Sequence, residues 1–272
     1  WKLKRMAASL QPQVVRGWMN RASRVLPRGA WVNVGRLGGY YDLKYYRRCD
    51  HLVCNTPDIR DYVMNSGWPS TRVHYVPNFF SASPGPPADR AALRTPADAR
   101  VLLVLARLET VKGIDVAIRA LGSVANAVLW IAGEGSKRES LEKVARECGV
   151  AQRVKFLGWR DDRSALLKAA DVCLIPSRHE PFGNVVLGAW THDVPLVSAA
   201  SQGPRFLVRD GEDGLLVPVD DPEEMARATT RILGNPELAQ ALTANGARRV
   251  AGEFSEAVVV SQYRELLQRI SR

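Results

Sequence analysis

Ala170-Asp-Val-Cys-Leu-Ile-Pro176 runs directly into Ser177-Arg-His-Glu-Pro-Phe-Gly-Asn-Val-Val-Leu-Gly188 in the second half of the chain. The first segment is a short apolar run closed by proline, which predicts a buried strand, and the residues from Asn184 onward predict a helix. Gly183 lies in the tight loop between them. A strand, a loop and a helix N-terminus bring free backbone N–H groups to one point, where the helix dipole favours negative charge. The stretch therefore predicts an α/β fold with a phosphate site, beside which Glu180 can bind hydroxyl groups.

The same alternation of strands and helices extends on both sides of this stretch. Further strands are predicted over 101–106, 127–132, 154–157, 195–198 and 214–217, and helices over 113–121, 137–148, 163–170, 222–233, 236–254 and 258–270. Strands that alternate with helices form a parallel sheet through right-handed crossovers. Such sheets bind ligands at the carboxyl ends of their strands. We therefore predict a Rossmann-like domain with its ligand site at that edge.

Before residue 90 a second, smaller α/β pattern is present. Strands are predicted over 31–34, 51–54 and 72–76, with a short helix over 42–47 and another that ends near 65. Thr56 and Pro57 are typical of a helix start, because the threonine caps free N–H groups and proline suits the first helical position. Segment 81–87 holds three prolines, one glycine and two serines, which neither a helix nor an inner strand tolerates.

We therefore divide the chain into four parts. These are a partial Rossmann-like domain over 1–80, a linker over 81–97, a larger Rossmann-like domain over 98–254 and a terminal helix over 255–272, which packs on either domain. Because the sequence begins with Trp1 rather than methionine, we expect that it starts inside a longer chain and that part of the first domain is missing.

The positive charge of the chain is concentrated near its start. Residues 1–90 hold 14 Lys/Arg and 5 Asp/Glu, whereas residues 91–272 hold 24 and 23. This imbalance predicts a surface that meets anionic material, either a phosphorylated acceptor or lipid head groups. The alternative is a truncated domain whose charge serves solubility. No nucleic-acid-binding motif is present, so we expect no nucleic acid partner.

Metal binding and membrane insertion are not predicted. The cysteines form no CxxC pair and the histidines are scattered, so we expect reduced core cysteines and no metal. No apolar run is long enough to span a membrane. We expect a cytoplasmic protein, with peripheral attachment to the inner face of the plasma membrane as a further hypothesis.

Two loops next to the phosphate loop carry groups that suit a diphosphate. Arg107 and Lys112 follow the first strand of the larger domain, where two cations can clamp a diphosphate, although this spacing is also common on solvated surfaces. Gly133 and Gly135 follow the next strand and let the backbone approach a ligand closely.

These motifs together resemble the retaining glycosyltransferases of the GT-B fold, within the GT4 family (glycosyltransferase group 1). The resemblance covers 100–224 and rests on Ala106-Arg-Leu-Glu-Thr-Val-Lys-Gly113, Ala132-Gly-Glu-Gly135, Phe156-Leu-Gly158, Ser177 to Gly183 and Asp210-Gly-Glu-Asp-Gly-Leu-Leu-Val-Pro218, in this order. It implies a nucleotide diphosphate sugar as donor and no cofactor or metal. The implied catalytic residues are Glu180, Arg107 and Lys112, and the implied donor-binding residues are Gly133, Gly135, Gly158, Trp159, Arg160, Phe182, Gly183, Asn184, Val185 and the position of Gly188.

The implied roles divide the donor among these loops. Arg107 and Lys112 bind its diphosphate, and Glu180 binds its sugar hydroxyls. The backbone of 158–160 holds the nucleobase, and the backbone of 182–185 holds the phosphates.

A narrower resemblance, over Arg36-Leu-Gly-Gly-Tyr-Tyr-Asp-Leu-Lys-Tyr-Tyr46, is to bacterial members that build lipopolysaccharide or other surface glycans. It implies a glycan or glycolipid acceptor. Tyrosines and cations here can stack on sugar and pair with phosphate, or the segment is an amphipathic helix that covers the domain core. The expected acceptor-side residues are Asn20, Arg21, Tyr40, Tyr41 and Lys44.

Two positions depart from the family pattern. Gly188 stands where relatives carry a glutamate that binds the nucleotide ribose, and Phe206 stands where many carry another glutamate. The prediction is a hexosyltransferase of surface-polysaccharide synthesis. The alternatives are a weakened or inactive homologue that binds nucleotide sugar or glycan, and a sugar-nucleotide epimerase or hydrolase of the same fold.

Overall fold

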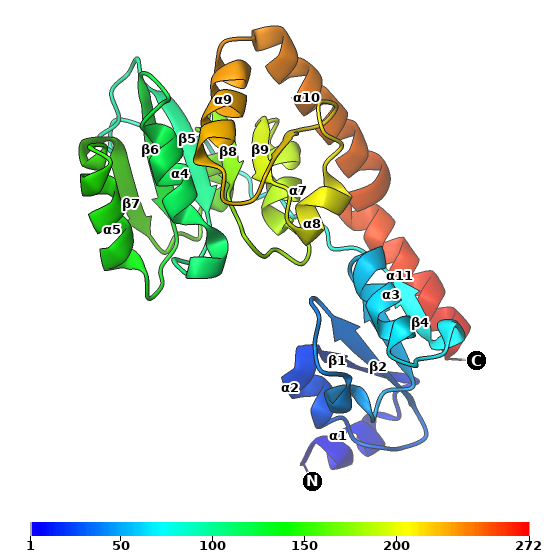
Figure 1. The fold of residues 1–272 in the computed structure, drawn as a ribbon. Helices are drawn as coiled ribbons and strands as arrows, with labels where there is room; N and C mark the ends of the chain where they lie inside the picture. Colours follow the sequence, from blue (N-terminus) through cyan, green and yellow to red (C-terminus); the bar gives the residue numbers. More distant parts are fainter. Residues whose placement is uncertain (1, 272) are drawn as a thin grey trace. The chain divides into compact units, whose positions relative to one another are not determined.

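The computed structural model describes residues 2–271 and divides them into two compact α/β units. The first unit contains the chain up to Phe79 and again from Glu253, and the second contains Phe80–Gly252 (Figure 1). Residues 81–87, the expected linker, form no helix or strand and group with the second unit. Trp1 and Arg272, the outermost residues of the predicted parts, lie outside the described residues.

The second unit contains a six-stranded parallel sheet with the strand order β10-β9-β8-β5-β6-β7. Its strands are β5 (Arg100–Leu105), β6 (Ala127–Ala132), β7 (Val154–Gly158), β8 (Val172–Ile175), β9 (Leu196–Ala199) and β10 (Leu215–Val217). Its helices are α4 (Ile114–Leu121), α5 (Arg138–Glu147), α6 (Arg163–Lys168), α7 (Asn184–Thr191), α8 (Gln202–Leu207), α9 (Pro222–Leu233) and α10 (Pro236–Arg249). The predicted α/β alternation is confirmed.

Two details of the second unit differ from the prediction. The helix predicted over 236–254 ends as α10 at Arg249 and continues as one π-helical turn, Val250–Phe254. Helix α8 was not predicted, because its second and third residues are Gly203 and Pro204, a pair typical of turns.

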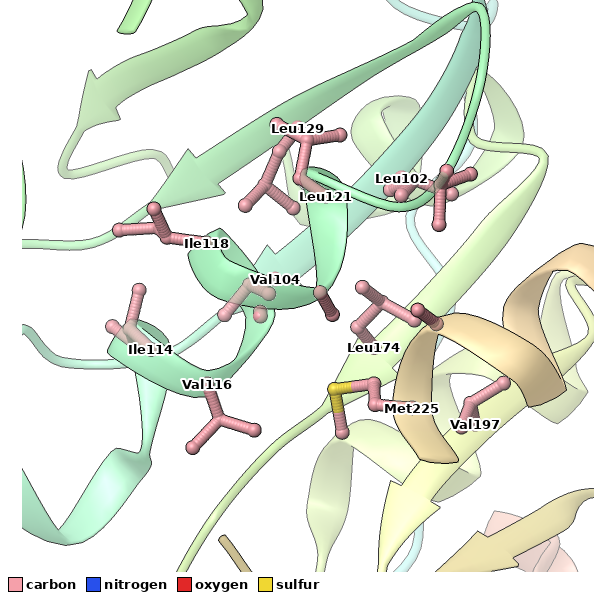
Figure 2. Packing of buried hydrophobic residues seen from close by; sticks show 14 of the residues in the cluster. Leu102, Val104, Ile114, Val116, Ile118, Leu121, Leu129, Leu174, Val197 and Met225 are labelled. Carbon is pink, nitrogen blue, oxygen red and sulfur yellow. The ribbon is translucent and has the colours of Figure 1, made fainter. Parts of the chain in front are cut away.

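The core of the second unit explains why β6 is apolar along its whole length. All six residues of β6 are buried, because helices cover both faces of a parallel sheet. Figure 2 shows Ile118 and Leu121 of α4 beside Leu129, with Met225 of α9 near Val197 on the same side. Each fully buried side chain of this kind contributes about 1.5–3 kcal/mol.

The first unit contains a four-stranded parallel sheet in the order β1-β2-β3-β4. Its strands are β1 (Val14–Trp18), β2 (Val32–Leu37), β3 (His51–Cys54) and β4 (Val73–Tyr75), and its helices are α1 (Lys2–Leu10), α2 (Met19–Arg24), α3 (Pro57–Asn65) and α11 (Glu256–Ile270). The predicted cap of α3 is confirmed, since the Thr56 hydroxyl accepts a hydrogen bond from the Ile59 N–H at 3.1 Å.

Two segments of the first unit complete its core. Helix α11, expected to pack on either domain, lies in the first unit, where Val259 and Leu266 pack with Val34 of β2. The predicted short helix over 42–47 is instead a 3₁₀ turn, Leu43–Tyr46, which starts where the Asp42 carboxylate accepts from the Lys44 N–H.

Candidate functional site

A pocket lies at the carboxyl edge of the second sheet. Its lining residues come from the ends of β5, β6 and β7, from the starts of α6 and α7, and from the segment before the linker. They are Phe80, Leu105, Ala106, Arg107, Ala132, Gly133, Trp159, Arg160, Arg163, Asn184 and Val185. The cavity volume is about 170 Å³. Since a water molecule occupies about 30 Å³ of liquid, the cavity has room for one ring-sized group. Six predicted site residues therefore share one pocket.

The two glycines after β6 are required by contact between loops. Gly133 has φ of 150°, and a Cβ on it would lie 2.0 Å from the Ala106 carbonyl oxygen. A Cβ on Gly135 would lie 2.4 Å from the Leu108 carbonyl oxygen. The Leu108 N–H also donates to the Glu134 carbonyl at 2.9 Å. These glycines therefore have a role besides the predicted close approach to a ligand, because they let the β6 loop pack on the β5 loop.

Two of the predicted catalytic residues form an ion pair. The Lys112 ammonium lies 2.6 Å from the Glu180 carboxylate, and the two side chains are only 17% and 18% exposed. Gly113 makes this possible, since its φ is 60° and a Cβ there would lie 2.0 Å from the Pro176 carbonyl oxygen. The loops after β5 and β8 are therefore in backbone contact, which fixes both charged groups before any ligand binds.

Arg178 holds the same two loops together and was not predicted. Its guanidinium forms a two-pronged ion pair with Asp115, at 2.8 and 2.7 Å, and a third contact with Asp220 at 2.6 Å. Burial alone would raise the pKa of the Asp115 carboxyl, but the Arg178 guanidinium lowers it below its usual range. Its place in the quoted motif, two residues before Glu180, is the only sequence signal for it.

The loop expected to hold phosphates lies between β8 and the N-terminus of α7, as its sequence predicts. Gly183 adopts φ of 102° and is the N-cap of α7, so no side chain at this position covers the helix N-terminus. Phe182 is buried, whereas Asn184 and Val185 line the pocket. The positive end of the helix dipole therefore points toward the pocket wall.

The loop after β7, expected to hold the nucleobase and here called the nucleobase loop, is more exposed than the loop before α7. Gly158 has φ of 69° and Trp159 is 72% exposed. The Arg160 guanidinium is held by Asp162, with its Nε donating at 2.7 Å.

An aromatic ring lies against Gly188. A Cβ on this glycine would lie 3.0 Å from Cε2 of Phe80 and 3.3 Å from Cδ1 of Leu167. The Phe80 ring also contacts His192 edge-on, with ring centroids 5.7 Å apart, and the Arg163 guanidinium lies 5.8 Å from its centroid. None of the described lining residues is acidic, and three are arginines. Phe206, the other departure, is 37% exposed on α8.

The expected acceptor-side residues lie on α2 and on the segment around the Leu43–Tyr46 turn, two elements of the first unit that contact each other. Tyr40 donates its hydroxyl hydrogen bond to Asp58 and contacts Tyr62 edge-on, and burial is the main reason that its pKa is raised. Lys44 pairs with Asp42 at 2.6 Å. Tyr41 packs against the core, and Asn20 and Arg21 lie on α2 after β1. The stacking role considered for Tyr46 is wrong, because this side chain is fully buried.

Comparison with known proteins decides the family. The profile described as "Glycosyl transferases group 1" matches residues 87–249. This chain belongs to that family. It is 39% identical to the lipopolysaccharide core biosynthesis glycosyltransferase LpsE of Rhizobium meliloti (strain 1021) over 269 residues, which cover 98% of this chain and 78% of that protein. Identity to LpsD of the same strain is 36%, covering 99% and 79%.

Solved structures show the same fold. The Anabaena protein HepE in complex with UDP and glucose superimposes with a TM-score of 0.80 at 21% identity, over 88% of this chain and 72% of that one. The chain is thus a GT-B glycosyltransferase, and an epimerase or hydrolase is not favoured. No helix between residues 2 and 271 is long and apolar enough to cross a membrane. The same residues contain no group of three or more potential metal ligands.

Proposed function

We propose that this glycosyltransferase moves a hexose from a nucleotide diphosphate sugar to a glycan or glycolipid acceptor in lipopolysaccharide core or other surface-polysaccharide synthesis. The observation that carries the proposal is the pocket that joins Arg107, the nucleobase loop and the start of α7. The names of LpsE and LpsD and the UDP bound to HepE support the acceptor and donor classes.

The chain's own groups supply the charge that transfer needs. When the bond from sugar to diphosphate breaks, negative charge develops on the leaving group. Arg107, Lys112 and the N-terminus of α7 stabilise that charge from fixed positions. Glu180 holds Lys112 at 2.6 Å and orients the sugar hydroxyls, so we assign it a binding role rather than that of a nucleophile. With two cations in place, we propose that transfer needs no metal and no cofactor, and that EDTA leaves the rate unchanged.

Calorimetric titration with UDP, GDP and ADP tests the donor site. We expect saturable binding of one nucleotide, weakened about ten- to a hundred-fold by Arg107→Met through loss of a charged hydrogen bond. Arg146→Met, an exposed position on α5, is the matched control and should leave binding unchanged. Absence of binding to any of the three nucleotides would refute the donor-site assignment.

Transfer and its stereochemistry need a second experiment. The protein is incubated with the nucleotide sugar whose base it binds and with a truncated lipopolysaccharide core, and the anomeric proton of the product is observed by NMR. Retention is expected from the family resemblance. An inverted product would contradict it, and nucleotide release without acceptor would indicate hydrolysis.

One observation favours a weaker transferase. Gly188 brings no carboxylate to the pocket, and the Phe80 ring occupies the adjacent space. Donor binding without detectable transfer would support this alternative.

The basic first part of the chain suggests a place for the reaction. We propose peripheral attachment to an anionic membrane surface, motivated by its 14 Lys/Arg against 5 Asp/Glu. Binding to vesicles that contain anionic lipid should fall as salt rises. Binding that is indifferent to salt would count against the proposal.

A further inference from the structure

Three polar atoms without a hydrogen-bond partner lie at the carboxyl edge of the first sheet. They are Nε of Arg36, Oδ1 of Asn20 and Oδ1 of Asn55, each unpartnered among the described residues. Arg36 is the penultimate residue of β2, Asn55 directly follows β3, and Asn20 lies in the first turn of α2, two residues after the end of β1. Since β1, β2 and β3 are neighbours in parallel register, the three residues lie within two positions of adjacent strand ends.

Arg36 is an unusual group for a protein interior. It is only 2% exposed, and no carboxylate in residues 2–271 lies within ion-pair distance of it. Its Nη1 donates to the Leu37 carbonyl and its Nη2 to Asn78, so the guanidinium is held in place while Nε points to no acceptor. Buried charges are normally paired, and an unpaired one marks a candidate functional site.

The side chain over this guanidinium is accessible. The Trp18 indole is 51% exposed, and the Arg36 guanidinium lies 5.4 Å from its ring centroid. Arg16 lies 4.6 Å from the same ring, so the indole contacts two cations. The next residue, Met19, has φ of 59°, a strained value for a side chain of this size. We expect a ligand to reach Nε by displacing this exposed indole.

The unpartnered atoms define the ligand by complementarity. Two amide oxygens accept hydrogen bonds, which sugar hydroxyls donate. One guanidinium N–H donates and carries a positive charge, which suits a phosphate or carboxylate oxygen. A half-exposed indole offers a flat apolar surface for the face of a ring. A neutral sugar would leave the guanidinium unpaired.

We propose that Trp18, Asn20, Arg36 and Asn55, here called the edge cluster, bind a sugar that carries a phosphate or carboxylate group. The anionic group pairs with Arg36, hydroxyls donate to the two asparagines, and the ring packs on Trp18. The inference rests on the proposed transfer only in that it identifies this anionic sugar as part of the acceptor. Its charge preference can be measured without transfer.

Ligand-observed NMR titration of the whole chain with three probes tests the proposal. The probes are glucose 6-phosphate, glucuronate and glucose. We expect one or both anions to bind at least about ten-fold more tightly than glucose, as a charged hydrogen bond predicts. The first two probes distinguish phosphate from carboxylate. Equal binding of all three would overturn the proposal.

Variants show whether the preference for anions comes from the edge cluster. Arg36→Met should abolish the preference for anions, whereas Arg47→Met, which removes an exposed cation of the same unit, should leave it intact. If Arg36→Met does not fold, as judged by circular dichroism, Arg36→Lys and Asn20→Ala decide. Each of these two variants should bind the preferred anion more weakly than the wild type does. If both variants bind it with wild-type affinity, the proposal is overturned.

Nucleotide titration of the same proteins separates this inference from the donor site. UDP, GDP and ADP should bind Arg36→Met as they bind the wild type. Loss of the anion preference with nucleotide binding intact supports the edge cluster. An intact donor site with no anion preference refutes the edge cluster alone.

Discussion

The two parallel sheets end differently at their carboxyl edges. In the second unit, Lys112 pairs with Glu180 and Arg178 pairs with Asp115, and glycines allow the loops to contact through their backbones. In the first unit, the buried guanidinium of Arg36 has no counter-charge among the described residues. The charged groups at the edge of the second sheet are thus paired and fixed before a ligand binds, as electrostatic catalysis requires. The edge of the first sheet has polar atoms without hydrogen-bond partners, and we propose that a ligand supplies those partners.

Removal of the Lys112 charge should produce the largest effect on activity. Lys112→Met takes away a cation that we propose stabilises the leaving diphosphate, and we expect kcat to fall about 10²- to 10³-fold, as for other preorganised donors. The measurement is steady-state transfer. Lys143→Met, which removes an exposed ammonium from α5, is the control and should leave kcat unchanged. A fall of less than three-fold in Lys112→Met would remove Lys112 from the proposed mechanism.

Loop contact at the second edge can be broken by one methyl group. Gly113→Ala adds a Cβ about 2.0 Å from a carbonyl oxygen at φ of 60°, whereas Gly149→Ala adds one at φ of 69° with no atom within 4 Å. Both variants incur backbone strain of about 1–2 kcal/mol, and only the first also forces the loops apart, for about 1–3 kcal/mol more. Urea unfolding should therefore show the larger loss for Gly113→Ala. Equal losses would mean that the contact between loops adds no stability.

The space beside Gly188 gives a third test of a preformed edge. Gly188→Glu should lose about 1–3 kcal/mol of stability, because its Cβ meets the Phe80 ring at 3.0 Å and overpacks the site. Phe80 lines the pocket, so nucleotide binding should also weaken, by about three- to ten-fold or roughly 0.7–1.4 kcal/mol. Phe80→Ala/Gly188→Glu frees that space, so the carboxylate can reach the pocket and binding should become tighter than in Gly188→Glu. Calorimetric titration with nucleotide measures the affinity of each variant. Tighter binding by Gly188→Glu alone would show that Phe80 does not obstruct the position.

The second edge was largely predictable because its groups follow strands directly. Arg107, Gly133 and Asn184 each stand at a strand end or helix start in the sequence, and a parallel sheet gathers such positions at one edge. The pairing of Lys112 with Glu180 was not predictable, since the two residues are 68 positions apart and only the folded loops bring them together. For the same reason the sequence offered no partner for Arg178.

The first unit was predicted less well, because the sequence motif from Arg36 to Tyr46 does not distinguish buried from exposed side chains. Arg36 follows the strand predicted over 31–34 and resembles a surface cation in sequence, yet it is buried. Tyr46 resembles part of a sugar-stacking surface, yet its ring packs over Gly35, where a Cβ would lie 2.7 Å from it. Burial of this kind depends on which strand lies beside which. The order β1-β2-β3-β4 is a property of the fold rather than of any local segment.

A histidine pair at the other end of the first sheet gives the smallest predicted effect. Nδ1 of His51 lies 3.0 Å from Nε2 of His74, and burial, followed by the charge of His51, lowers the pKa of His74 to about 4. An unfolded histidine titrates near 6.5, so the unfolded chain binds more protons between these values. Stability should therefore be complete above about pH 6.5 and decline as the pH falls toward 4.

Urea unfolding across this pH range measures the decline. His74→Gln should flatten it, whereas His179→Gln, an exposed position in the second unit, should leave the slope as in the wild type. Because His74 is half-buried, we expect a change of only about 1 kcal/mol, reduced by solvent screening. An unchanged slope in His74→Gln would show that His74 is not the source. The decline would then be assigned to other groups, first of all His51, whose pKa is also lowered by burial.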